Sequence, residues 1–166
     1  MPNKNIFFIP DENLGRHVAK QIPEKNIILN KGFCHVHVSM TADNLKAIKE
    51  KYPKALVLAH PECLPEVSAL ADYVGSTSGI IDYATKSDAE EFVICTETGV
   101  FYELKKKNPG KKFYPASAHQ ICPDMKKITL EKVRDVLKNE SNAVTVEKEL
   151  SEKSGRPLER MLELAK

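Results

Sequence analysis

Residues 55–63 read Ala-Leu-Val-Leu-Ala-His-Pro-Glu-Cys, an apolar run that is followed at once by polar and reactive side chains. Such a short, continuously apolar run is typical of a strand that is buried on both faces of a parallel sheet. Ligands of α/β proteins bind beyond the carboxyl ends of such strands, where His60, Glu62 and Cys63 stand. This stretch therefore predicts an α/β fold with a site at one edge of its sheet.

Similar apolar runs recur along the chain and alternate with amphipathic stretches. The runs that predict strands are Asn5–Ile9, Asn26–Asn30, Ala55–Ala59, Glu91–Cys95, Lys112–Tyr114 and Ala143–Val146. Helices are expected after a cap at Thr41, after Pro65, around Ile80, after a cap at Thr129, and over Pro157–Ala165. This alternation predicts an α/β protein with mostly parallel strands.

Two of the predicted strands begin units that resemble each other. One passes from a strand to Asp11, Gly15 and a helix, and the other passes from a strand to Glu97, Gly99 and a helix. A fold built from duplicated α/β modules would explain this repeat. Two unrelated strand–helix units can also look alike, so both interpretations stay open.

Composition excludes several classes of protein. The 166 residues are 42% hydrophobic and 29% charged, which is typical of a soluble globular chain rather than a disordered one. The net charge of +2 gives no reason to expect nucleic-acid or membrane binding, and no apolar run is long enough to cross a bilayer. The first residues lack the apolar core of a secretory signal, so we expect a cytoplasmic protein.

The four cysteines lie far apart and form no Cys-x-x-Cys pair, which argues against a zinc ribbon. Isolated cysteines of this kind are often small buried hydrophobes. Here, however, loops with Cys, His or Glu follow several strands, and they can converge at one sheet edge. Those loops are 31–37, 60–63, 95–97 and 119–125. One ligand per loop would suit a metal centre or an iron–sulfur cluster.

Two further patterns are candidate substrate contacts. His60 and Glu62 are separated by a proline, and such a pair can serve as acid and base or orient a polar substrate. The alternative is a solvated turn. Gly75-Ser76-Thr77-Ser78 precedes an apolar helical run and could bind a phosphate or carboxylate at the start of that helix. The alternative for this segment is plain helix capping.

Taken in order, the motifs of this chain resemble the quinolinate synthase family, the iron–sulfur transferases of NAD (pyridine nucleotide) biosynthesis. The matching segments are Phe8–Arg16, Gly32–His37, His60–Cys63, Ala71–Ser78, Thr96–Gly99, Cys122–Met125 and Leu158–Leu162. They cover nearly the whole chain. The sequence departs from the family pattern at Asn30, where tryptophan is usual, and at Val38, where an acidic residue is frequent.

The resemblance implies a fold of three similar three-layer α/β/α sandwich domains with short parallel sheets, arranged around a pseudo-threefold axis. It implies the condensation of iminoaspartate with dihydroxyacetone phosphate to quinolinate. Aspartate oxidase or aspartate dehydrogenase would supply the iminoaspartate. It also implies a [4Fe-4S] cluster that is held by one cysteine from each third of the protein, with an open iron that acts as a Lewis acid.

By motif match, the resemblance also assigns roles to single residues. The assigned residues are Cys34 and Cys122 as cluster ligands, His60 and Glu62 as catalytic and substrate-binding residues, and Ser76 and Thr77 as substrate-binding residues. Cys63 stands beside the catalytic pair and is left without a role. Cys95 is interpreted as a small packing residue.

Measured against the family pattern, the first third is expected to be absent from this chain. Residues 1–33 would then be the C-terminal part of the second α/β domain, residues 34–122 the complete third domain, and residues 123–166 a helical segment that packs on the absent first domain. The third cluster cysteine is missing, so Cys63 or another chain would have to supply a thiolate. Exposed strand edges lead us to expect self-association.

Two other functions remain open from the sequence. The chain could be a non-catalytic α/β remnant that keeps the fold for binding. It could also be a zinc or redox protein that uses Cys34, Cys63 and Cys122 together with His37 or His60.

Overall fold

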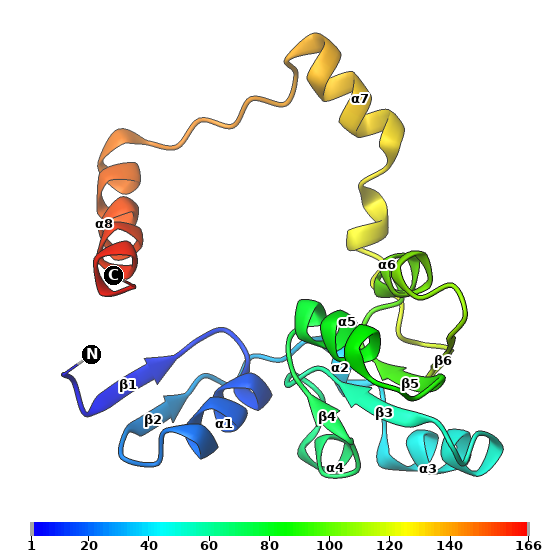
Figure 1. The fold of residues 1–166 in the computed structure, drawn as a ribbon. Coiled ribbons are helices and arrows are strands. Elements are labelled where there is room, and N and C mark those ends of the chain that lie inside the picture. The colour runs from blue at the N-terminus through cyan, green and yellow to red at the C-terminus, as the bar shows by residue number, and fades with distance from the viewer. Residues whose placement is uncertain (1, 166) are drawn as a thin grey trace. The chain divides into compact units, whose positions relative to one another are not determined.

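The computed structural model describes residues 2–165, and it begins with a strand–helix–strand unit (Figure 1). Strands β1 (Asn5–Phe8) and β2 (Asn26–Leu29) pair in parallel, with Asn5 opposite Asn26 and Phe8 opposite Leu29. Helix α1 (Glu12–Gln21) connects them and begins after Asp11, whose side chain caps it. This two-stranded sheet confirms two predicted strands to within one residue at each end.

The second sheet has four parallel strands in the order β4-β3-β5-β6. They are β3 (Leu56–Ala59), β4 (Tyr73–Val74), β5 (Glu91–Cys95) and β6 (Lys112–Pro115). The chain leaves β3 toward β4 and then returns to the other side of β3 to form β5. The gap between β3 and β5 is therefore the topological switch point, where open α/β sheets bind their ligands.

Helices cover both faces of this sheet, as Figure 1 shows. The helices of this part of the chain are α2 (His35–Val38), α3 (Ala42–Lys51), α4 (Pro65–Ser68), α5 (Thr77–Lys86) and α6 (Val100–Lys107). Because side chains alternate along a strand, each face builds its own core. Val57 and Val93 pack with Leu45 and Val67 on the α3–α4 face. Residues from α5 and α6 pack with Leu58, Phe92 and Ile94 on the other face. The predicted α/β sandwich with short parallel strands is confirmed.

Residues 123–165 belong to a second compact unit, and residues 3–122 form the other. It contains a short 3₁₀ helix η1 (Met125–Lys127), α7 (Leu130–Asn139) and α8 (Lys148–Leu164). Thr129 caps α7 as predicted, and its side chain accepts a hydrogen bond from the Lys132 N–H. Helix α8 begins well before the predicted start at Pro157, which lies inside it. The domain boundaries proposed from the sequence stay a prediction.

Two differences from the predicted elements have simple physical causes. The strand expected at Ala143–Val146 is wrong, because residues 141–147 are exposed and have no neighbouring strand to pair with. Strand β4 was not predicted, since two residues are too few to show a period. Among the described residues, no helix combines the length and apolar character that a membrane span requires.

Candidate functional site

The candidate site lies at the carboxyl edge of β3 and β5, at the topological switch point. His60 follows β3 directly, and its backbone N–H donates to the carbonyl of Cys95, the last residue of β5, at 3.1 Å. Thr96 follows β5 and is buried. His60 therefore lies at the predicted edge of the sheet.

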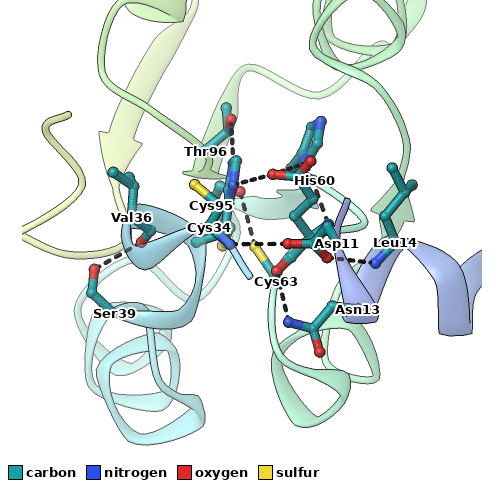
Figure 2. A network of polar contacts seen from close by, with 12 residues as sticks. Asp11, Asn13, Leu14, Cys34, Val36, Ser39, His60, Cys63, Cys95 and Thr96 are labelled. Carbon is teal, nitrogen blue, oxygen red and sulfur yellow. Dashed lines mark hydrogen bonds and ion pairs between the residues drawn. The ribbon is translucent and has the colours of Figure 1, made fainter. Parts of the chain in front are cut away.

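Two histidines and a glutamate are in contact at this edge. The rings of His37, from α2, and His60 stack with centroids 4.5 Å apart. Glu62 Oε2 lies 3.0 Å from His37 Nδ1 and 3.9 Å from His60 Nδ1. On the other side of its ring, His37 Nε2 lies 3.0 Å from the hydroxyl of Thr96, in a hydrogen bond drawn in Figure 2. The structure thus brings the predicted pair together and adds His37 to it.

His37 has an unusual environment for a buried imidazole. Its side chain is only 9% exposed, and Nδ1 has no hydrogen-bond partner among the residues that the structure describes. The 3.0 Å approach of Glu62 Oε2 does not have the direction of a hydrogen bond. Buried polar atoms are rarely left unpaired, so this nitrogen is a candidate ligand or proton acceptor.

Burial also sets the protonation of these three groups. It lowers the pKa of His37, against the opposing charges of Asp11 and Glu97. It lowers the pKa of His60 as well, with a further contribution from His37. Burial raises the pKa of Glu62, and the nearby His60 opposes that shift. Neutral imidazoles next to a carboxyl group with a raised pKa are suited to proton transfer near neutral pH.

The first strand–helix–strand unit contributes to the same site. Asp11 is buried, and its Oδ2 accepts a hydrogen bond from the Cys34 N–H at 2.9 Å, which Figure 2 shows. Its Oδ1 accepts from the Leu14 N–H at 2.8 Å and so caps α1. Asn13 Nδ2 donates to the carbonyl of Glu62 at 3.2 Å. These contacts hold Cys34 and Glu62 close together.

Within residues 2–165, one group of side chains has the composition of a metal site: Cys34, His37 and Glu62, whose candidate ligand atoms all lie within 4.8 Å of one another. Cys34 and Glu62 also line a pocket of about 350 Å³. Asp11 and Gly32 form part of its wall.

The other predicted ligand, Cys122, lies outside this group but is also held by an acidic residue. Its N–H donates to Glu97 Oε1 at 3.3 Å. The preceding loop is fixed by Gln120, which is fully buried and donates to the carbonyls of Ile94 and Thr96. Like Cys34, Cys122 is half-buried.

The remaining two cysteines are packing residues in this structure. Cys63 and Cys95 are both buried, and the Cys63 thiol donates to the Cys95 carbonyl at 3.3 Å. Burial raises the pKa of Cys63 and raises the pKa of Cys95 to about 12, which keeps both as thiols. The interpretation of Cys95 agrees with its burial, and Cys63 does not join the group of candidate ligands.

Ser76 and Thr77 follow β4 at the same carboxyl edge of the sheet and are exposed. Ser76 caps α5, with its hydroxyl accepting from the Gly79 N–H at 3.1 Å. Among the described residues, no hydrogen bond links this pair to His60 or Glu62. The capping alternative is therefore realised, and the anion-binding role stays a prediction.

Reasoning from sequence missed several residues of this site. The motifs contain Asp11, Thr96 and Glu97 without giving them a role, although Thr96 and Glu97 are the first two residues after β5 and Asp11 is the third after β1. His37 was considered only as an alternative zinc ligand. Its spacing of three from Cys34, on one helical turn, was the signal that could have paired them.

Comparisons with known proteins agree with this picture. Residues 1–163 match the family described as quinolinate synthetase A protein. The quinolinate synthase of Caldicellulosiruptor saccharolyticus is 51% identical over 164 residues, and that of Caldicellulosiruptor bescii is 52% identical over 163 residues. These alignments cover 99% and 98% of this chain and 54% of each relative. The quinolinate synthase of Aquifex aeolicus is 50% identical, with 98% of this chain and 52% of the relative covered. The chain spans about half the length of these curated relatives.

Proposed function

The chain belongs to the quinolinate synthase family, and from this premise we propose that it forms the C-terminal half of an enzyme that condenses iminoaspartate with dihydroxyacetone phosphate to quinolinate. The observation that carries the proposal is the contact of His37, His60 and Glu62 beside Cys34 at the switch point of the sheet. The reaction would take place in the cytoplasm, and aspartate oxidase or aspartate dehydrogenase would supply the iminoaspartate.

His60 and Glu62 are proposed to transfer protons. Joining an imine to a hydroxyketone phosphate with loss of water and release of inorganic phosphate requires a base that takes a proton from carbon and an acid that protonates a departing hydroxyl. Burial favours a neutral His60 and raises the pKa of Glu62, so a base and an acid stand side by side. His37, stacked on His60 and bonded to Thr96, would keep the pair in position.

Ser76 and Thr77 are proposed to contact the phosphate or a carboxylate of the substrates. They stand at the start of α5, which has ten residues, where backbone N–H groups and hydroxyls favour an anion. Both residues are exposed and so are accessible to a ligand.

A [4Fe-4S] cluster is the proposed cofactor, and the cysteines of this chain fit two of its three ligand positions. Cys34 and Cys122 are half-buried thiols, whereas Cys63 and Cys95 are buried with raised pKa values. Cys34 and Cys122 would hold the cluster, and the third thiolate would come from the other half of the enzyme. When bound, the cluster would supply a Lewis acid to the dehydration chemistry.

The test is to combine this chain with the N-terminal half of a relative such as the Caldicellulosiruptor enzyme. After anaerobic reconstitution with iron and sulfide, we expect quinolinate from the mixture and little from either half alone. Glu62→Gln should lower the rate at least about 100-fold, in the range of general acid–base catalysis. The matched control is Glu66→Gln, which changes an exposed residue of α4. Full activity from this chain alone, or no activity from a folded mixture, would contradict the proposal.

A further inference from the structure

We propose that this chain, when it holds no iron–sulfur cluster, binds one zinc-type divalent cation through Cys34 Sγ, His37 Nδ1 and a carboxylate oxygen of Glu62. The candidate ligand atoms of these residues already lie within 4.8 Å of one another, so small side-chain movements complete the site. Thiolate, imidazole and carboxylate are the ligands that zinc takes in proteins. Three protein ligands leave a fourth position for water.

The second observation is that the buried Nδ1 of His37 makes no hydrogen bond within the described residues. The side chain is only 9% exposed, and Nδ1 has no hydrogen-bond partner within residues 2–165. When Nε2 donates its proton to the Thr96 hydroxyl, 3.0 Å away, Nδ1 carries the lone pair and can bind a cation. Nδ1 and Glu62 Oε2 are 3.0 Å apart and both electron-rich, and a cation between them would satisfy both.

Each of the three ligand residues also makes a supporting polar contact, through the ring of His37 and through the main chain of Cys34 and Glu62. Thr96 orients the His37 ring, and the Asp11 carboxylate accepts from the Cys34 N–H at 2.9 Å. Asn13 Nδ2 donates to the Glu62 carbonyl at 3.2 Å. Figure 2 shows Asp11, Asn13 and Thr96 arranged around the site. Supporting contacts of this kind fix ligands in metal sites and are typical of them.

The proposed cation site uses a thiolate, an imidazole and a carboxylate, whereas the proposed cluster is held by cysteines. The two sites share Cys34. The cation and the cluster would therefore exclude each other, and zinc would block cluster assembly on this chain. Binding would form a bond between the cation and the Cys34 sulfur and release the thiol proton to water. The inference does not depend on the proposed reaction, since it concerns binding alone.

The experiment uses the full 166-residue chain, purified under reducing, metal-free conditions, with Zn²⁺ and Co²⁺ as probes. Zinc affinity is measured by competition with a chromogenic chelator. Cobalt binding is followed by its thiolate charge-transfer band and its visible bands. We expect one cation per chain, tetrahedral cobalt bands and a thiolate band that disappears in Cys34→Ser.

Matched controls are available close to each ligand. Cys34→Ser, His37→Gln and Glu62→Gln should each weaken zinc binding by about 100-fold or more, judged against the 10- to 100-fold cost of losing a supporting contact alone. Cys122→Ser, His35→Gln and Glu66→Gln should leave the affinity within about threefold. His35 and Glu66 are exposed neighbours of the ligands. Circular dichroism verifies that each variant is folded.

A measurement on the unmodified chain avoids any folding defect of the variants. Zinc should slow alkylation of Cys34 at least about tenfold and leave Cys122 unchanged, as read by mass spectrometry of the labelled peptides. Absence of one-to-one binding, cobalt spectra without a thiolate band, or protection of Cys122 in place of Cys34 would each overturn the inference. None of these results depends on quinolinate formation, so a failure here is separate from a failure of the proposed function.

Discussion

The buried carboxylate of Asp11 accepts a hydrogen bond from the backbone N–H of Cys34 at 2.9 Å. The same relationship recurs at the second predicted cysteine ligand, where Glu97 accepts from the Cys122 N–H at 3.3 Å. In both cases the acidic residue follows a parallel strand and the cysteine follows the neighbouring strand. The repeat seen in the sequence thus has a structural counterpart, in which an acidic side chain positions a thiol.

Replacing Asp11 tests this positioning role. Asp11→Ala removes the acceptor of both the Leu14 and the Cys34 N–H groups, so the free energy of unfolding should fall by about 2–3 kcal/mol. Asp11→Asn keeps one amide oxygen as an acceptor and should cost about half as much. Chemical denaturation followed by circular dichroism measures both values.

The control for this series is Asp82→Ala, which changes an exposed residue of α5 and should alter the free energy of unfolding by less than about 0.5 kcal/mol. Equal losses for Asp11→Ala and Asp82→Ala would show that the two hydrogen bonds of Asp11 contribute nothing to stability.

The four cysteines should differ sharply in reactivity. Cys63 and Cys95 are buried and have raised pKa values, so few of their thiols ionise at neutral pH. Cys34 and Cys122 are half-buried and open to reagents. In the native, metal-free chain, iodoacetamide should modify Cys34 and Cys122 at least about tenfold faster than Cys63 and Cys95. Mass spectrometry of the labelled peptides measures these rates. Equal rates in the folded chain would contradict the packing role of Cys63 and Cys95, and equal rates in denaturant are the expected control.

A side chain at Gly15 should destabilise the chain, because α1 packs closely on the first sheet. A Cβ at this position would lie 2.6 Å from Leu29 Cδ2 and 2.9 Å from Phe8 Cδ1. Gly15→Ala should therefore lower the free energy of unfolding by about 1–3 kcal/mol, although alanine favours a helix. Gly110→Ala is the control, since no described atom lies within 4 Å of its added Cβ and the change should be nearly neutral.

The sequence predicted the main sheet well, because continuous apolar strands carry a strong signal. Residues Glu91–Cys95 were predicted with the observed bounds, and the cap at Thr41 is present. The position of His60 and Glu62 at the sheet edge followed from the rule on strand ends. That rule places loops at one edge but gives no side-chain contacts. The stacking of His37 on His60 and the approach of His37 to Glu62 depend on how α2 packs, so they required the structure.

Thr96 should affect cation binding without being a ligand. Thr96→Val removes the hydroxyl that holds His37 Nε2 at 3.0 Å and keeps the shape of the buried side chain. Zinc affinity should fall about 10- to 100-fold, as is typical when a supporting contact of a metal ligand is lost. Thr96→Ser keeps the hydroxyl and should restore most of the affinity. An unchanged affinity in Thr96→Val would show that this hydrogen bond does not orient the ligand.

Truncation of the C-terminal end should leave stability unchanged, whereas truncation of the N-terminal end should weaken zinc binding. Both core clusters consist of buried residues between Met40 and Ala116, so a chain that ends at Cys122 retains them whole and should keep its free energy of unfolding to within about 0.5 kcal/mol. A chain that begins at Cys34 retains those clusters but loses the contacts of Asp11 with Cys34 and of Asn13 with Glu62. Its zinc affinity should fall at least about tenfold, because two of the three ligands lose their support. Denaturation and chelator competition measure the two effects. Equal zinc affinity in the two truncated chains would mean that residues 1–33 only cover the site, whereas the predicted difference would identify them as part of it.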